Sequence, residues 1–209
     1  MDLNHEFTVS VPVDEAWRIL TDVERIAPCL PGAELQEVEG DTYRGVVKVK
    51  VGPIQAQFKG QASFVERDDA AHRAVLKGEG RDTGGKGNAS ALITASMAPV
   101  SASETKVNVA TDLTITGKVA QFGRGAMADI SDKLLGQFVE NLNALIASQP
   151  ATASAPADTA PAGQSEGVRK IDAPEAKPID LLDAAGAPIL KRALPVVAVI
   201  AVVVWLFLR

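Results

Sequence analysis

The sequence is poor in the residues that build catalytic and metal centres. Its 209 residues include one cysteine, Cys29, and two histidines, His5 and His72. This scarcity excludes an internal disulfide framework and leaves no cluster of metal ligands at a recognisable spacing. A lone thiol between two prolines is typical of a structural turn and not of a nucleophile, which would need a base beside it. Residues 1–7 lack the basic start and apolar core of a secretion signal, so we expect the folded part of the chain in the reducing cytoplasm.

An excess of positive charge is also lacking, since 21 Lys and Arg residues are outnumbered by 26 Asp and Glu residues. The formal net charge is −5, and residues 1–148 account for all of it. A phosphate backbone repels an acidic domain, so the composition argues against nucleic acid as a partner.

Charge is missing altogether from a stretch near the C-terminus. Residues 193–208 are uncharged and almost wholly apolar. As a helix they would span about 24 Å, somewhat less than the roughly 30 Å core of a bilayer. Lys191 and Arg192 precede the run and Trp205 lies near its far end, where the positive-inside rule and the aromatic belt would place them. We therefore expect residues 191–209 to form a single-pass anchor on the cytoplasmic side of the inner membrane; the alternative is a buried core helix.

Large apolar side chains are rare between the domain and this run. Residues 149–178 contain five prolines and many alanines, too little apolar surface to offset the entropy of ordering the chain. We expect residues 149–190 to be a disordered tether. Its apolar residues Ile179, Leu182 and Ile189 either lie on the membrane interface or a partner, or belong to a solvated spacer.

Residues 1–148 show the periodic patterns of a folded domain. A strand over 3–9 is followed by apolar residues at helical spacing, from Val13 to Leu20, and by a second short helix that Asp22 can cap. The period then changes to two, in alternating runs at 43–51, 54–64, 71–77, 88–97 and 105–115. Residues 118–147 return to helical spacing for about 45 Å. The pattern predicts an α+β fold, in which an antiparallel sheet of six or seven strands wraps around a long C-terminal helix.

The inward faces of the predicted strands have few bulky side chains. Small residues there allow either a close helix and a solid core, or an apolar void between helix and sheet. We favour the void. The candidate lining residues are Phe58, Gly60, Ala62, Phe64, Ala91, Ile93, Met97, Phe122 and Ala126.

A glycine-rich loop with Gly84, Gly85, Lys86 and Gly87 joins two predicted strands. It lacks both the Ser or Thr and the following helix of a phosphate-binding P-loop, so we expect a mobile connection at a cavity mouth or partner contact.

Two other local patterns have plain structural interpretations. The glycines at 123 and 125 match a dinucleotide fingerprint by letters, but no second strand with a ribose-binding acid follows. They predict a helix start that approaches the sheet closely. Asp68 and Asp69 fall in a predicted turn, where we expect them to be solvated.

Three stretches carry a family resemblance: DVERIAPCLPGA at 22–33, GEGRDTGGKGNA at 78–89 and GKVAQFGR at 117–124. Together with the order of elements, they resemble the carbon monoxide dehydrogenase CoxG subunit family, of the START/Bet v 1-like (SRPBCC) helix-grip superfamily, over residues 1–148. The resemblance implies a helix-grip fold with an apolar cavity between sheet and long helix. It also implies an accessory protein that places a molybdenum-containing dehydrogenase at the inner face of the cytoplasmic membrane.

These expectations give one leading hypothesis and two alternatives. In the leading hypothesis, a non-catalytic, membrane-tethered domain recruits a carbon monoxide dehydrogenase-type enzyme. The domain also binds an apolar membrane molecule such as a quinone to support electron transfer, and it has no covalent cofactor or metal. The first alternative is a pure membrane anchor or scaffold without a ligand. The second is a hydrolase or cyclase acting on a lipid-like substrate, for which the sequence shows no nucleophile, base or metal constellation.

Overall fold

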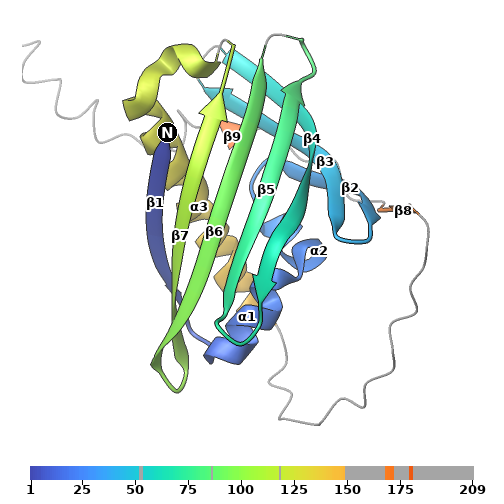
Figure 1. Cartoon of the computed structure of the whole chain (residues 1–209). Helices are drawn as coiled ribbons and strands as arrows, with labels where there is room; N and C mark the ends of the chain where they lie inside the picture. The colour runs from blue at the N-terminus through green and yellow to red at the C-terminus, as the bar shows by residue number, and fades with distance from the viewer. Residues whose placement is uncertain (52–53, 86, 118, 149–167, 172–178, 181–209) are drawn as a thin grey trace, which may run out of the picture.

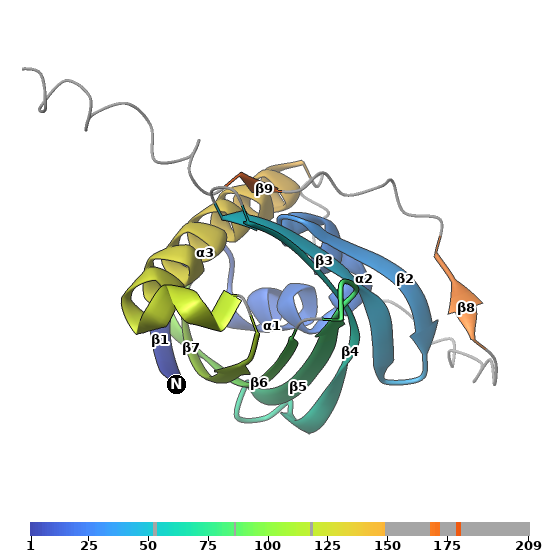
Figure 2. The same cartoon turned by 90° about the horizontal axis from the view of Figure 1, so that it is seen from above.

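An antiparallel sheet curves around one long helix in the computed structural model of the chain (Figures 1 and 2). The structure describes residues 1–51, 54–85, 87–117, 119–148, 168–171 and 179–180. The expected anchor, with Lys191, Arg192 and Trp205, lies outside these ranges. Within them, no helix is both long enough and apolar enough to cross a bilayer.

The chain begins with an edge strand and two short helices. Strand β1 (Asp2–Val9) leads to α1 (Val13–Thr21), α2 (Val23–Ile26) and a single 3₁₀ turn, η1 (Ala27–Cys29). The Asp22 carboxylate accepts a hydrogen bond from the backbone N–H of Arg25 at 3.2 Å, which is the cap expected from the sequence.

Six further strands complete the body of the sheet. They are β2 (Ala33–Glu39), β3 (Thr42–Val51), β4 (Ile54–Asp68), β5 (Arg73–Asp82), β6 (Asn88–Ser101) and β7 (Glu104–Ile115). The strand order is β1-β7-β6-β5-β4-β3-β2, and all of these neighbours are antiparallel. The α+β prediction is confirmed. Strand β5 runs five residues beyond the predicted 71–77, because its backbone is paired on both sides.

The long helix α3 (Gly123–Ala147) is shorter than the periodicity predicts. A 3₁₀ segment, η2 (Val119–Phe122), precedes it, and Gly117 and Gly123 have φ of +85° and +77°. These left-handed residues delay the helix start, so 25 residues and about 37 Å remain. The predicted close approach of Gly123 and Gly125 to the sheet is wrong, because a Cβ at either position would meet no atom within 4 Å.

The core gathers at one end of the molecule. There α1 and the C-terminal half of α3 pack on β1, β6 and β7 through a cluster with Val9, Trp17, Ile19, Val107 and Leu142. Leu142 is 0% exposed and Ile19 is 2% exposed. In the rest of α3, Met127 is the one buried residue among those whose side chains are described. The helix is thus firmly packed at one end and loosely covered along the remainder.

Two short strands from the predicted tether join the edge of the sheet. Strand β8 (Arg169–Lys170) pairs antiparallel with β2. Strand β9 (Ile179–Asp180) pairs parallel with β3, at positions beyond the first residue of β2. At these positions the structure differs from the disordered tether that we expected. The unpaired backbone groups of an edge strand are a ready template for such additions.

Candidate functional site

The face of the sheet that looks toward α3, called here the inner face, holds most of the predicted lining residues. Cross-strand register places Tyr43, Ala62, Gly78, Ala91 and Leu113 in one row across β3 to β7. Every member of this row is only partly buried. A solid core would bury such residues, so the middle of the inner face is incompletely covered by α3.

Two glycines of the inner face have opposite surroundings. A Cβ built at Gly78 would meet no heavy atom within 4 Å, which shows open space above the centre of the row. A Cβ at Gly60 would lie 1.9 Å from the carbonyl oxygen of Glu79. Gly60 therefore allows the backbones of β4 and β5 to lie close together, which is a different role from the cavity lining that we predicted.

The other predicted lining residues divide into three groups. Phe58 and Ile93 are half-buried on the inner face, and Ala126 is half-buried on α3. Phe64 is partly buried against the core, and Met97, 8% exposed, belongs to the core cluster itself. The side chain of Phe122 lies outside the description. The structure thus brings Phe58, Ala62, Phe64, Ala91 and Ile93 onto one face.

Two polar side chains on the inner face were not among the predicted site residues. Tyr43 is the single tyrosine of the chain, and its ring meets the edge of Phe64 at 6.3 Å between centroids. Its hydroxyl has no hydrogen-bond partner in the described part of the chain. Burial raises the pKa of Tyr43, and Asp41 adds to the effect, so the phenol stays protonated and can donate. The inward position of Tyr43 in the alternating strand was the one available signal.

His5 is another polar residue of this face. Its Nε2 lies 3.2 Å from the Asp132 carboxylate, and its side chain is 11% exposed while that of Asp132 is 69% exposed. The contact joins β1 to the middle of α3. It therefore fixes the helix over the sheet on the side opposite Tyr43.

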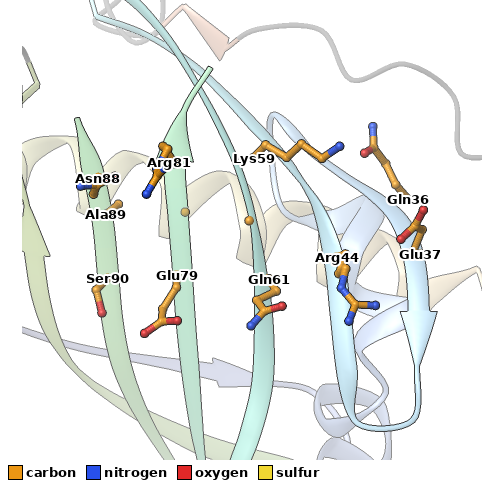
Figure 3. Close-up of a pocket in the computed structure, with 12 residues that line it drawn as sticks. Gln36, Glu37, Arg44, Lys59, Gln61, Glu79, Arg81, Asn88, Ala89 and Ser90 are labelled. Atoms are coloured by element: carbon orange, nitrogen blue, oxygen red, sulfur yellow. The ribbon is translucent and has the colours of Figure 1, made fainter. Parts of the chain in front are cut away.

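The opposite, outer face of the sheet carries an open groove of about 590 Å³ (Figure 3). Its floor is backbone at Gly60, Gly80 and Ala89. Polar side chains from five strands form its walls: Gln36, Glu37, Arg44, Lys59, Gln61, Glu79, Arg81, Asn88 and Ser90. Sequence reasoning missed the groove, because its residues are ordinary outward positions that only strand pairing brings together.

The groove has an uneven charge pattern. Arg44 lies 2.7 Å from Glu39, and Glu79 lies 2.6 Å from Lys77. Lys59 and Arg81 are direct cross-strand neighbours, and neither makes an ion pair with any residue that the structure describes. Like charges placed directly opposite destabilise a sheet, so this pair marks a place where an anion would be favoured.

The glycine-rich loop closes the β5–β6 hairpin at one end of the sheet. Gly84 and Gly85 are exposed, and Gly85 adopts φ +72° while its N–H bonds the Asp82 carbonyl at 2.9 Å. A Cβ at Gly87 would lie 2.3 Å from the Thr116 carbonyl, so this glycine lets the loop pack against the end of β7. Lys86 lies outside the described residues. The loop's predicted role at a cavity mouth or partner contact stays a prediction.

The described residues contain no group of three or more His, Cys, Asp or Glu that could hold a metal. Cys29 is buried, its carbonyl accepts a hydrogen bond from Asn141 Nδ2 at 3.0 Å, and burial raises the pKa of its thiol. Of the two histidines, His5 contacts Asp132 and His72 contacts Asp14 at 3.1 Å. These placements fit a structural cysteine.

Asp69 is more than a solvated turn residue. Its carboxylate accepts a hydrogen bond from the Trp17 indole N–H at 2.7 Å and another from Arg67 at 3.0 Å. These bonds, that of Trp17 first, lower the pKa of Asp69. The β4–β5 turn is therefore tied to α1, a contact across 52 positions of sequence that no local pattern reveals.

Comparison with known proteins places the chain in a family. A family model for the carbon monoxide dehydrogenase CoxG subunit matches residues 6–147. A conserved protein from Geobacillus kaustophilus is 19% identical with a TM-score of 0.64, covering 70% of this chain and 95% of that one. A truncated norcoclaurine synthase from Thalictrum flavum is 12% identical with a TM-score of 0.51, covering 72% and 95%.

At these identities the two solved structures establish the helix-grip fold and nothing more. Among curated proteins there is no match to the chain. The family model, in contrast, spans nearly the whole folded domain, and it agrees with the motifs at 22–33, 78–89 and 117–124. The chain belongs to the carbon monoxide dehydrogenase CoxG subunit family.

Proposed function

We propose that this protein is a non-catalytic accessory protein that recruits a molybdenum-containing, carbon monoxide dehydrogenase-type enzyme to the membrane. In the same proposal, it holds an apolar membrane molecule, such as a quinone, between the inner face and α3. One observation carries the ligand half of the proposal. The space above Gly78 is open, and the side chains around it are apolar and only partly buried. Such a site gains free energy when an apolar molecule covers it.

The chemistry of the inner face suits a flat ring with a polar edge. Ala62, Gly78 and Ala91 form a low platform across three strands. On the same face, Ile93 lies one row away and Phe58 lies two rows away. Tyr43 ends the platform row with a protonated hydroxyl. A quinone offers an apolar ring that fits the platform and carbonyl oxygens that accept a hydrogen bond from Tyr43.

The membrane half of the proposal rests on the sequence after the domain. Residues 191–209 have the composition of a short membrane anchor, with Lys191 and Arg192 at its cytoplasmic end and Trp205 near the other. A soluble dehydrogenase that passes electrons to a membrane pool needs proximity to that pool or a carrier for the acceptor. A tethered domain with an apolar site supplies both.

The experiment is to purify the full chain from cells and to analyse the extracted lipids by mass spectrometry. We expect an isoprenoid quinone or a similar apolar molecule at a near-stoichiometric ratio. Gly78→Leu should lose this molecule, because its side chain occupies the open space. Lys77→Leu is the matched control, since it adds the same side chain at the next position on the outer face.

Each outcome has a definite meaning. A wild-type chain that is consistently empty would overturn the carrier half and leave a ligand-free anchor. A folded Gly78→Leu chain that supports electron transfer from the dehydrogenase as well as wild type would do the same. Turnover of a lipid-like substrate by the isolated protein would instead support an enzyme.

Tyr43→Phe tests the polar contact separately. Removing a hydrogen bond worth about 1 kcal/mol should weaken quinone binding roughly fivefold and leave an aliphatic ligand unaffected. Equal affinity of both proteins for a quinone would remove Tyr43 from the site.

A further inference from the structure

Charge is segregated between the two ends of the sheet. One end, called here the basic end, carries the β3–β4 turn, the β5–β6 turn and the connection from β7 to α3 (Figure 1). Residues 45–65 contain three cations and no acid, and residues 113–128 contain two cations and no acid. The opposite end carries acidic turns, with Glu39 and Asp41 between β2 and β3, and Asp68 and Asp69 between β4 and β5.

Four cations of the basic end share the outer face. Lys48 and Lys50 lie on β3, Lys59 lies on β4 and Arg81 lies on β5, all at positions whose side chains point away from α3. We call these four residues the basic patch. The side chain of Lys48 is only 13% exposed and contacts Glu34 at 3.7 Å. The patch therefore presents chiefly Lys59 and Arg81, which are exposed and have no ion pair within the part of the chain that the structure describes.

Among the described residues, three acids share this part of the outer face with the patch: Glu34 contacts Lys48, Glu79 contacts Lys77 at 2.6 Å, and Glu37 lines the same groove as Lys59 and Arg81. The other described acids at this end lie away from the patch. Asp112 contacts the N-terminal ammonium at 3.4 Å and Asp2 lies beside it on β1, at the far side of the sheet. Asp82 follows Arg81 but occupies an inner-face position opposite Phe58. Asp180 lies on β9 beside Lys50. The patch therefore keeps a local positive charge even though the chain as a whole is acidic.

The chain leaves the described domain at the basic end. Strands β8 and β9 follow the edge of β2 and β3 in the direction of β3, so that Ile179 and Asp180 pair with Val49 and Lys50 near the β3–β4 turn. The backbone N–H of Ile171 also bonds the Gln36 carbonyl at 2.8 Å. Ten residues then separate Asp180 from Lys191, a reach of at most about 40 Å. The start of the expected anchor is therefore tethered within about 40 Å of the basic end.

We propose that the basic patch docks on anionic phospholipid headgroups and holds the domain with its basic end toward the membrane. The inference rests on the membrane half of the proposed function. At physiological salt the Debye length is about 8 Å, which is short beside the roughly 37 Å of α3. Headgroups at the basic end are thus attracted by the patch and screened from the acidic end.

The test uses the full chain in vesicles of phosphatidylcholine alone or mixed with phosphatidylglycerol. A polarity-sensitive dye is attached to Thr83→Cys at the basic end or to Ala70→Cys at the acidic end; native Cys29 is buried and should not react. We expect the dye at position 83 to enter the headgroup layer only on anionic vesicles and to leave it at high salt. The dye at position 70 should stay in water throughout.

Paired variants locate the effect. Lys59→Gln with Arg81→Gln should lower the ratio of docked to undocked signal about 25-fold, at roughly fivefold per cation. Arg18→Gln with Lys106→Gln removes the same charge at the acidic end and should change nothing. Thermal unfolding of both double variants checks that they are folded.

The results separate this inference from the proposed function. Equal dye responses at the two positions, or a patch variant that behaves like its control, would overturn the docking surface. A response at position 83 to the dehydrogenase but not to vesicles would assign the patch to a protein partner and overturn the lipid assignment. A chain that docks normally but carries no quinone would overturn the carrier proposal alone.

Discussion

The contrast between Gly78 and Gly60 gives the sharpest prediction, because the two glycines lie on the same face in adjacent rows. Gly78 has no positive φ, and a Cβ added there would have no neighbour within 4 Å, so Gly78→Ala fits without strain. It should stabilise the fold by about 0.4–1 kcal/mol, because alanine restricts the unfolded chain. The melting temperature should rise by roughly 1–4 °C.

Gly60→Ala should have the opposite effect. Its Cβ would lie 1.9 Å from the Glu79 carbonyl oxygen and 2.6 Å from the Gly80 Cα, so the backbones of β4 and β5 must separate. We expect a loss of about 1–3 kcal/mol, as for overpacked cores. Differential scanning calorimetry and urea unfolding of both variants measure the difference. If Gly78→Ala were as destabilising as Gly60→Ala, the space above Gly78 would be filled and the reasoning about the site would fail.

Three further predictions concern the scaffold. Leu142→Ala should cost about 2–5 kcal/mol in urea unfolding, because Leu142 is 0% exposed in the core cluster; a loss below about 1 kcal/mol would contradict that packing. Asp69→Asn should lower the melting temperature at neutral pH. The pKa of Asp69 is lower in the folded protein than its unfolded value of 3.8, so its ionised form stabilises the fold fully above pH 3.8. This stabilisation is lost as the pH falls through the folded pKa, so the melting temperatures of wild type and Asp69→Asn should converge in acid. Cys29 should react with a thiol reagent far more slowly in the native than in the urea-unfolded protein, and equal rates would refute its burial.

Local patterns were sufficient for the elements and for much of the inner face. Alternation through residues 54–64 placed Phe58, Ala62 and Phe64 inward, and cross-strand pairing confirms that face. The cap at Asp22 and the long helix follow equally from residue type and spacing. These features depend on neighbours in sequence, so a sequence alone contains them.

Other features depended on strands that are distant in sequence. The alternating pattern ends at residue 77, and the position of Gly78 on the inner face is visible only because β5 pairs on both sides as far as Arg81. The outer groove draws on five strands, and each contributes unremarkable polar residues. The hydrogen bond between Trp17 and Asp69 has no local signature either.

By itself the sequence determined the order of strands and helices, the smallness of the inward residues, the family motifs and the apolar run after the domain. It could not say which small residue leaves space and which one permits a close approach of two strands. Only the tertiary structure decided this, since the outcome depends on what lies within reach of a Cβ added at each position. The Glu79 carbonyl oxygen lies 1.9 Å from that point at Gly60, whereas no heavy atom lies within 4 Å of it at Gly78, where the open space motivates the proposed function.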